Sequence, residues 1–347
     1  MLLFGSQPTE SGVPDRHGKT TAVNTILPTR RRRPRLLVAL VATVALLAGC
    51  GLRLETPPPP SPTPDASEVA RQRASADSLV LEALAAPGGP AGPVADVRSM
   101  IAQQAAEHVA QLGPARPSNT PSVTARATPS ATARATPAPS GTPDAVVAQL
   151  VATATNARKD AAAVPDGSLA RLLGSVSTAR LLLARQLAAT AGLPVPALPD
   201  VTMPTSVPDG LAPSALSALV ADEDEAGYAD EVIAAKLSDP ARSSAMDRAA
   251  VHRDRAEQWA KLAQIGQTGL DPRRTAYALG ALDDPAVATA LAASLEGALA
   301  TTYAALTADA TPDSRPVLLD ALTDAAAAAT AWGAAVPAFP GMPDLSR

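Results

Sequence analysis

A short apolar run that ends in the only cysteine of the chain determines which part of the sequence is expected to fold. Five arginines lie within residues 30–35, an uncharged and mostly aliphatic run fills residues 36–49, and Cys50 follows directly. A basic segment, an apolar segment of about 7–15 residues and a small-residue cleavage site are typical of a secretory signal. The last four residues of this stretch, Leu-Ala-Gly-Cys, are typical of a bacterial lipobox, in which the cysteine is lipidated and becomes the new N-terminus. We therefore expect residues 1–49 to be removed as a lipoprotein-type signal peptide and Cys50 to carry lipid.

A transmembrane helix is the alternative interpretation of residues 36–49. A membrane-spanning helix needs about 20 apolar residues, and this run is shorter. Four consecutive prolines at residues 57–60 also prevent a helix from continuing. Two export routes stay open, because the arginine pair at 32 and 33 suits the twin-arginine route and the whole arginine cluster suits the general one.

Lipidation of Cys50 has consequences for stability and for partners. No second cysteine exists, so neither a disulfide nor thiolate chemistry remains and the fold depends on packing. Residues 1–49 hold seven basic and two acidic residues of the 29 and 33 in the chain, which leaves 22 basic against 31 acidic ones. This acidic balance argues against nucleic acid as a partner and against a polybasic membrane-binding patch. We expect contact with the membrane through the lipid alone, on the extracytoplasmic face of the bacterial cell membrane.

The remaining chain alternates between helical patterns and proline-rich segments. Residues 50–65 form a proline-rich spacer that is expected to be extended. Residues 66–192 form an N-terminal helical region, and residues 193–213 form a second proline-rich linker. Breaks at Gly-Pro and Gly-Gly-Pro sequences divide the helical region into four predicted helices, at 66–86, 94–112, 144–164 and 166–191.

A low-complexity loop at residues 115–143 interrupts that helical region. It contains the repeated sequence Thr-Ala-Arg-Ala-Thr-Pro, first from Thr124 and again from Thr132. With almost no large apolar side chain to bury, the loop is predicted to be disordered. Two interpretations stay open for its serines and threonines: they carry O-linked sugars, or the loop is an unmodified linker.

Residues 214–347 form a different kind of segment, because every aromatic residue except Phe4 lies there. Aromatic side chains bury the largest areas, so we expect the best-packed core in this segment. Apolar residues at 3–4 spacing predict four amphipathic helices. Three of them begin at the sequences Asp239-Pro240, Asp284-Pro285 and Thr311-Pro312, which are typical helix starts.

Polar residues interrupt the apolar stripes of the first three of these helices. Glu223, His252 and Glu296 each lie at a position that otherwise faces inward. Inward carboxylates and histidine are typical of di-iron bundles, which need a Glu from each of two helices and Glu-x-x-His from each of the other two. Here Ala249 stands in place of that second glutamate, and the stripe of the fourth helix offers no ligand.

The three groups are therefore interpreted as a candidate buried polar network without a metal. Buried charges are tolerated when they are paired, and Arg253 or Arg255 is the expected partner of this network. A rotated helix would instead leave some of the three exposed. His108, near a helix end beside Gly113, is expected to be solvated or to cap that helix.

The order of several short motifs resembles a known family. Glu223 and Tyr228 in the first helix of this segment, the His252-Arg253 pair in the second, Leu295-Glu296 and Tyr303 in the third, and the Phe339-Pro340-Gly341 tail are similar to the ferritin-like domain of unknown function at the C-terminus of actinobacterial lipoproteins. The chain departs from this pattern at Asp224, where relatives often have histidine. The resemblance implies an all-α fold, with a C-terminal ferritin-like four-helix bundle at residues 214–347 preceded by the second helical region and its disordered Pro/Ser/Thr-rich linkers. It implies an envelope location and no established activity.

No catalytic motif was found in the chain. It has no Gly-rich phosphate loop, no Gly-x-Ser-x-Gly elbow and no His-Glu-x-x-His. We therefore expect a lipid-anchored envelope protein that is not an enzyme, takes no cofactor and has a binding or scaffold role toward an unknown envelope partner. The alternative is a metal-binding ferritin-like protein with a degenerate site.

Overall fold

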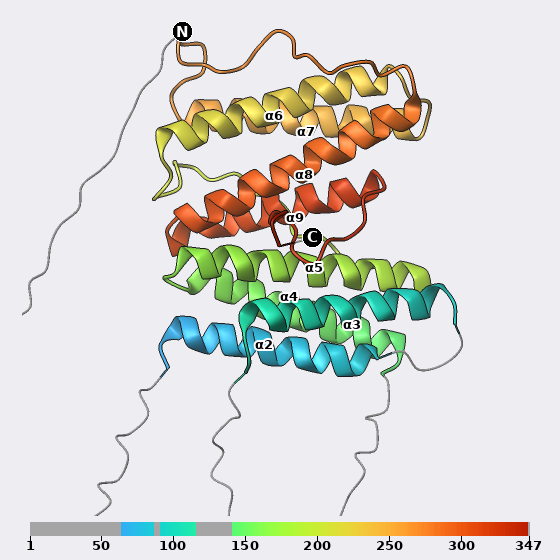
Figure 1. Ribbon diagram of the computed structural model, residues 1–347. Helices are drawn as coiled ribbons and strands as arrows, with labels where there is room; N and C mark the ends of the chain where they lie inside the picture. Colours follow the sequence, from blue (N-terminus) through green and yellow to red (C-terminus); the bar gives the residue numbers. More distant parts are fainter. Residues whose placement is uncertain (1–63, 87–90, 116–140, 346–347) are drawn as a thin grey trace, which may run out of the picture. The chain divides into compact units, whose positions relative to one another are not determined.

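The protein is all-α, as the sequence predicts. The computed structural model describes residues 64–86, 91–115 and 141–345, and within them it has eight α-helices, one 3-10 turn and no strand (Figure 1). The helices are α2 (Ala66–Ala85), α3 (Pro93–Leu112), α4 (Pro143–Ala163), α5 (Gly167–Ala191), α6 (Pro213–Ala234), α7 (Ala241–Leu262), α8 (Pro285–Asp309) and α9 (Arg315–Ala331). The predictions for the signal peptide, for Cys50 and for most of the two low-complexity segments fall outside the described residues.

Three aspartates set helix starts by capping free backbone N–H groups. The Asp65 carboxylate accepts a hydrogen bond from Glu68 N at 2.8 Å, Asp166 caps α5 and Asp284 accepts one from Ala286 N at 2.8 Å. Such a cap contributes about 1 kcal/mol. The helix start predicted at Asp284-Pro285 is confirmed.

The predicted starts of α7 and α9 need correction. Pro240 directly precedes α7, and the Asp239 carboxylate accepts a hydrogen bond from the Ser243 hydroxyl at 2.6 Å instead of capping a backbone N–H. The sequence Thr311-Pro312 opens only a 3-10 turn (Pro312–Ser314), and α9 begins after it. This helix ends at Ala331, so Trp332 and Val336 lie beyond its end.

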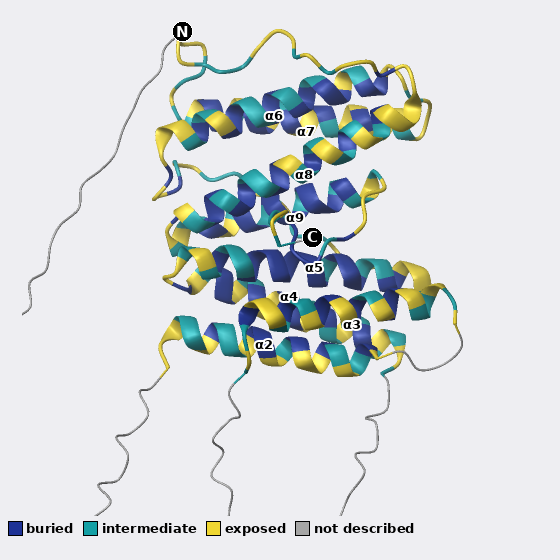
Figure 2. Ribbon diagram, in the orientation of Figure 1, coloured by how far each residue is buried: buried dark blue, intermediate teal, exposed yellow. Residues whose placement is uncertain are grey.

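The helices form four antiparallel hairpins that pack on one another. The pairs are α2 with α3, α4 with α5, α6 with α7 and α8 with α9, and α5 also packs against α8 and α9 (Figure 1). One hydrophobic cluster contains residues from all eight helices, among them Leu81, Leu183, Leu219, Tyr303 and Leu322. The core is therefore shared between residues 66–192 and 214–347, not concentrated in the later segment, and buried faces line the packed sides of every hairpin (Figure 2).

The C-terminal tail is fixed to the first half of the protein. Side chains of α3 and α5 donate hydrogen bonds to carbonyl oxygens of residues 336–341. These are Gln104 Nε2 to Val336 O at 2.7 Å, Ser175 Oγ to Pro340 O at 2.8 Å and Arg171 Nη2 to Gly341 O at 3.2 Å. Gly341 has φ +75°, and a Cβ there would lie 2.6 Å from Ala300 O. Only glycine suits this close crossing over α8.

His108 belongs to the same contact, which corrects the prediction of a solvated or capping residue. Its side chain is buried, its Nε2 lies 2.8 Å from Ala338 O, and its ring packs edge-on against Phe339. Burial lowers the pKa of His108 to about 3. The imidazole is therefore neutral and holds the tail as a hydrogen-bond donor.

The linker at residues 193–212 contains no helix and runs along the surface of the bundle. Among the helices in the described part of the chain, none has the length and apolar character required to cross a membrane.

Candidate functional site

The inward faces of α6, α7, α8 and α9 bring seven charged side chains together inside the last four helices. We call this group the charge cluster; its members are Glu223 and Asp230 from α6, Arg248, His252 and Arg255 from α7, Glu296 from α8 and Asp324 from α9. The 3–4 spacing that places Leu219, Ala226 and Ile233 in the core also turns Glu223 and Asp230 inward. The helical pattern thus places the carboxylates of Glu223 and Asp230 in the protein interior, where burial is costly unless they are paired.

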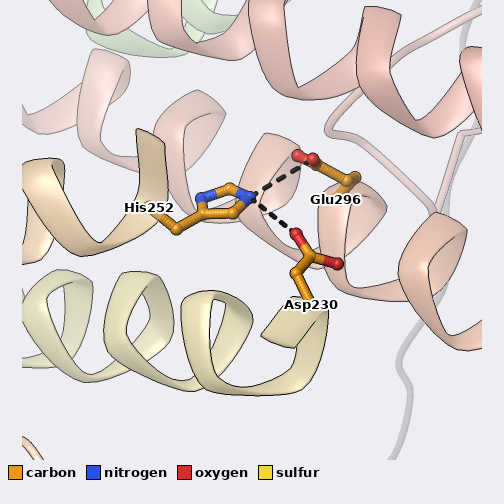
Figure 3. A group of neighbouring side chains, drawn as sticks. All are labelled: Asp230, His252 and Glu296. Carbon is orange, nitrogen blue, oxygen red and sulfur yellow. Dashed lines mark hydrogen bonds and ion pairs between the residues drawn. The ribbon is translucent and has the colours of Figure 1, made fainter. Parts of the chain in front are cut away.

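His252 lies at the centre of the charge cluster. Its Nδ1 is 2.6 Å from Glu223 Oε2, and its Nε2 is 3.3 Å from Glu296 Oε1 and 3.8 Å from Asp230 Oδ2 (Figure 3). The exposed fractions of His252, Glu223, Glu296 and Asp230 are 1%, 0%, 2% and 3%. The structure therefore brings together all three residues that the sequence singled out, and it adds Asp230.

Glu223 is held on its other side by the α8 residue Tyr303. The Tyr303 hydroxyl donates a hydrogen bond to Glu223 Oε1, while Glu223 Oε2 accepts from His252 Nδ1. Burial raises the pKa of Tyr303 well above its ordinary value, so its hydroxyl stays a donor. This chain of two hydrogen bonds orients the imidazole, with Nδ1 donating to Glu223 Oε2.

Arg248 is the main cationic partner of the cluster. It donates two hydrogen bonds to Glu296, from Nε at 2.5 Å and from Nη2 at 2.8 Å, and a third from Nη1 to Asp324 Oδ2 at 2.8 Å. Arg255 also donates to Asp324 Oδ2, at 2.7 Å. A forked arginine–carboxylate pair of this kind fixes geometry as well as charge.

The expected arginine partners were therefore wrong in part. Arg253 points away from the cluster and pairs with Asp224 and Glu231. Arg255 is linked to the other members of the charge cluster through its hydrogen bond to Asp324. Arg248 was not among the expected partners, although its position four residues before His252 places it on the same helix face.

The charges of the cluster depend on one another. Burial alone would lower the pKa of His252, but its hydrogen bonds to Glu223 and Glu296 outweigh burial and raise the pKa to about 9. Burial would raise the pKa of Glu296, and His252 and Arg248 reverse that shift and lower it. Burial would also raise the pKa of Asp324, but the nearby Arg248 and Arg255 outweigh burial and lower it.

Asp230 is the exception in the cluster. Its carboxylate receives no hydrogen bond from the described residues, and its one ion-pair contact is the 3.8 Å approach to His252 Nε2. Burial raises the pKa of Asp230 to about 7. A buried carboxylate without a close donor is costly and requires an explanation.

Comparison with known proteins finds a family match for the C-terminal part of the chain. Residues 215–344 match the family described as Domain of unknown function (DUF4439). The prediction of a C-terminal domain of unknown function is confirmed by this match. No curated protein and no solved structure matches the chain.

The charge cluster of the DUF4439 domain does not fit a di-iron centre. Helix α7 supplies His252 with Ala249 where a glutamate is required, and α9 supplies only Asp324, which Arg248 and Arg255 already neutralise. A second metal ion would need carboxylates that are free to bind it, but the guanidinium groups of Arg248 and Arg255 already occupy Asp324. A different set of three fits one ion better: suitable ligand atoms of Asp230, His252 and Glu296 all lie within 4.8 Å of one another.

Two neighbouring surface pockets lie beside the charge cluster. The first has a volume of about 680 Å³ and is lined mainly by alanine and aliphatic side chains of α5, α9 and the linker. The second, of about 580 Å³, is bordered by Arg248, Arg255 and residues of the linker between 198 and 203. Leu198 and Asp324 line both pockets, and His252 lines neither.

Proposed function

We propose that this protein is a lipid-anchored component of the bacterial cell envelope with a non-catalytic binding or scaffold role. Cys50 would carry the lipid, the proline-rich spacer would separate the helical body from the membrane, and the helices would present a binding surface on the extracytoplasmic side. The proposal keeps the sequence-based expectation that the protein is not an enzyme.

The burial of the charge cluster is the observation that carries this proposal. An acid–base catalyst must come within hydrogen-bond reach of its substrate, yet His252 and the carboxylates around it are closed off from solvent. Both nitrogens of His252 already face carboxylates. Such an arrangement orders four helices and leaves no group free to react with a substrate.

The connections between the last four helices support a ferritin-like bundle. Helices α6 and α7 form one hairpin, α8 and α9 form another, and the long connection over residues 263–284 joins them (Figure 1). One long crossover between two hairpins is typical of ferritin-like folds.

The two surface pockets support a binding role. The first is largely apolar and the second is bordered by charged side chains, and ligand sites commonly combine an apolar lining with a few polar groups. The aliphatic lining of the first comes mainly from α5, α9 and the linker, so both halves of the protein would form the binding surface together.

The substitution Cys50→Ser tests the anchor. Because no second lipid attachment site is evident in the sequence, the variant is expected to lose membrane retention and to accumulate as unprocessed or released protein. Cell fractionation and the intact mass of the protein measure both effects. A matched substitution outside the lipobox, Ser61→Ala, should leave both unchanged. Normal processing and membrane retention of the Cys50→Ser variant would contradict the proposal.

A second candidate function is metal binding by a degenerate ferritin-like site. The specific observation in its favour is the convergence of Asp230, His252 and Glu296 (Figure 3). Metal analysis of the purified protein separates the candidates: less than about 0.1 equivalent of Fe, Mn or Zn after incubation with each metal leaves only the first.

A further inference from the structure

We propose that Asp230, His252 and Glu296 bind a single divalent transition-metal ion inside the DUF4439 domain. The ion would be structural, linking α6, α7 and α8 at one point. This inference deepens the second candidate function and does not depend on the lipid anchor.

The spacing of the ligand atoms suits one ion. His252 Nε2 lies 3.3 Å from Glu296 Oε1 and 3.8 Å from Asp230 Oδ2. Zinc-type ions bind nitrogen and oxygen at about 2.0–2.2 Å in tetrahedral geometry, which places two ligand atoms about 3.4 Å apart. Only small side-chain movements are needed to place one ion among the three atoms.

The isolation of Asp230 is the independent observation that points to a ligand. Asp230 has an exposed fraction of only 3%, and its carboxylate faces His252 Nε2. It accepts no hydrogen bond from the described residues. The other carboxylates of the charge cluster all accept hydrogen bonds. A metal ion bound to Asp230 Oδ2 would give this carboxylate a close partner in place of the 3.8 Å approach to His252 Nε2.

The surroundings of His252 are those of an oriented metal ligand. Metal-bound histidines commonly donate their second ring N–H to a carboxylate, which fixes the ring and increases its basicity. Here Glu223 accepts from Nδ1 at 2.6 Å and is held in turn by the Tyr303 hydroxyl. An ion would displace the Nε2 proton of His252, and the lone pair left on Nε2 would face Asp230 and Glu296 (Figure 3).

Glu296 can serve the ion and Arg248 at once. An ionised carboxylate has about four acceptor positions, and the two hydrogen bonds from Arg248 occupy only two of them. The charges also balance once the ion has displaced the His252 proton: four ionised carboxylates then face two arginines and one dication, and the sum is zero. The arginines thus allow one ion and exclude a pair.

The donor set selects the class of ion. One imidazole nitrogen and two carboxylate oxygens suit Zn²⁺, Mn²⁺, Fe²⁺ and Co²⁺. Ca²⁺ requires six to eight oxygen ligands and Mg²⁺ retains several waters, for which this closed site offers too few oxygens and little space.

Titration with Co²⁺ alone tests the proposal directly. The full chain, purified in detergent and treated with EDTA, is expected to bind one Co²⁺ per chain with visible absorption bands, and Zn²⁺ should displace it. Asp230→Asn should weaken Co²⁺ binding more than about 100-fold, because loss of an outer partner alone costs about 10–100-fold. Glu223→Gln should weaken it about 10–100-fold.

Asp222→Asn is the matched control for this titration. Asp222 lies beside Glu223 on α6 but accepts its hydrogen bond from Thr302, at 2.9 Å, outside the charge cluster. Its binding curve should coincide with that of the wild type, and circular dichroism should give the same helical signal for all variants. Less than about 0.1 equivalent of Co²⁺ in the wild type would overturn the proposal, as would equal binding by Asp230→Asn. Either result leaves the anchor proposal intact, because Cys50→Ser is measured separately.

Discussion

At the scale of single residues, the charge cluster joins seven charged side chains from α6, α7, α8 and α9. Glu223, His252 and Glu296 could be found from sequence because each interrupts an apolar stripe at helical spacing. Asp230 lies on the same stripe as Glu223, but two turns along the helix, about 10.5 Å by rise alone. The sequence could not show that His252 Nε2 faces Asp230 and Glu296 while Nδ1 faces Glu223. That placement depends on how α6 and α7 are offset along their axes, which local pattern does not determine.

The pH dependence of stability tests the charges at this scale. The pKa of His252 is raised from an ordinary 6.5 to about 9 in the folded protein. A raised pKa stabilises the fold fully below pH 6.5, and this contribution is lost as the pH rises toward 9. The loss is on the order of 3 kcal/mol. In EDTA, unfolding in denaturant should therefore give a lower free energy at pH 9.5 than at pH 6.

Replacement of the titrating group is the control for this pH series. His252→Gln should be destabilised at pH 6 and should show a flatter pH profile, because its side chain cannot gain a proton. Asp230, with a pKa raised to about 7, adds a loss of the same sign at lower pH. A wild-type free energy of unfolding that rises between pH 6 and pH 9.5 is incompatible with a protonated His252.

At the scale of helices, the helix ends could be predicted from sequence better than the tertiary contacts between helices. Aspartate caps and apolar spacing place most helix ends within two or three residues of those observed. The misplaced start of α9 has a physical reason, because its first turn is fixed by a tertiary contact of Arg315. This buried side chain donates hydrogen bonds to the carbonyls of Thr307, Ala310, Ala161 and Val164, at the ends of α8 and α4. The last carbonyls of a helix have no partner within the helix.

Substitution of Arg315 measures the value of this shared cap. Arg315→Ala leaves buried carbonyls at two helix ends without donors, and we expect a loss of about 3 kcal/mol in the free energy of unfolding. Arg242→Ala, at an exposed position on α7, is the control and should stay within about 0.5 kcal/mol of the wild type. Urea denaturation checks both values. Equal stability of the two variants would show that solvent replaces the lost bonds.

At the scale of the whole molecule, residues 66–192 and 214–345 depend on each other. The proline-rich linker suggested two bodies with separate cores, and sequence offers no local signal for contact across it. The structure instead packs α5 against α8 and α9, and α3 and α5 hold the C-terminal tail. The matched domain at 215–344 therefore ends in a segment whose partners lie outside it.

A fragment of residues 205–347 tests this dependence. Without α5, the apolar faces of α8 and α9 are exposed and the tail loses its hydrogen-bond donors, so we expect no cooperative thermal transition. The fluorescence of Trp259 and Trp332 reports the loss of packing, with the full chain as control. A fragment that melts cooperatively within about 5 °C of the full chain, a difference of only about 1–2 kcal/mol, would contradict the shared core.

The charge cluster of the DUF4439 domain is proposed to bind one metal ion. Anomalous diffraction from crystals of the full chain grown with Zn²⁺ tests it most directly. We expect one peak bonded to His252 Nε2, Asp230 Oδ2 and Glu296 Oε1 at about 2.0–2.2 Å, with Glu223 still hydrogen-bonded to His252 Nδ1. Crystals without a peak at this position, in which His252 Nε2 donates a hydrogen bond to Glu296 and Asp230 stays without a partner, would contradict it.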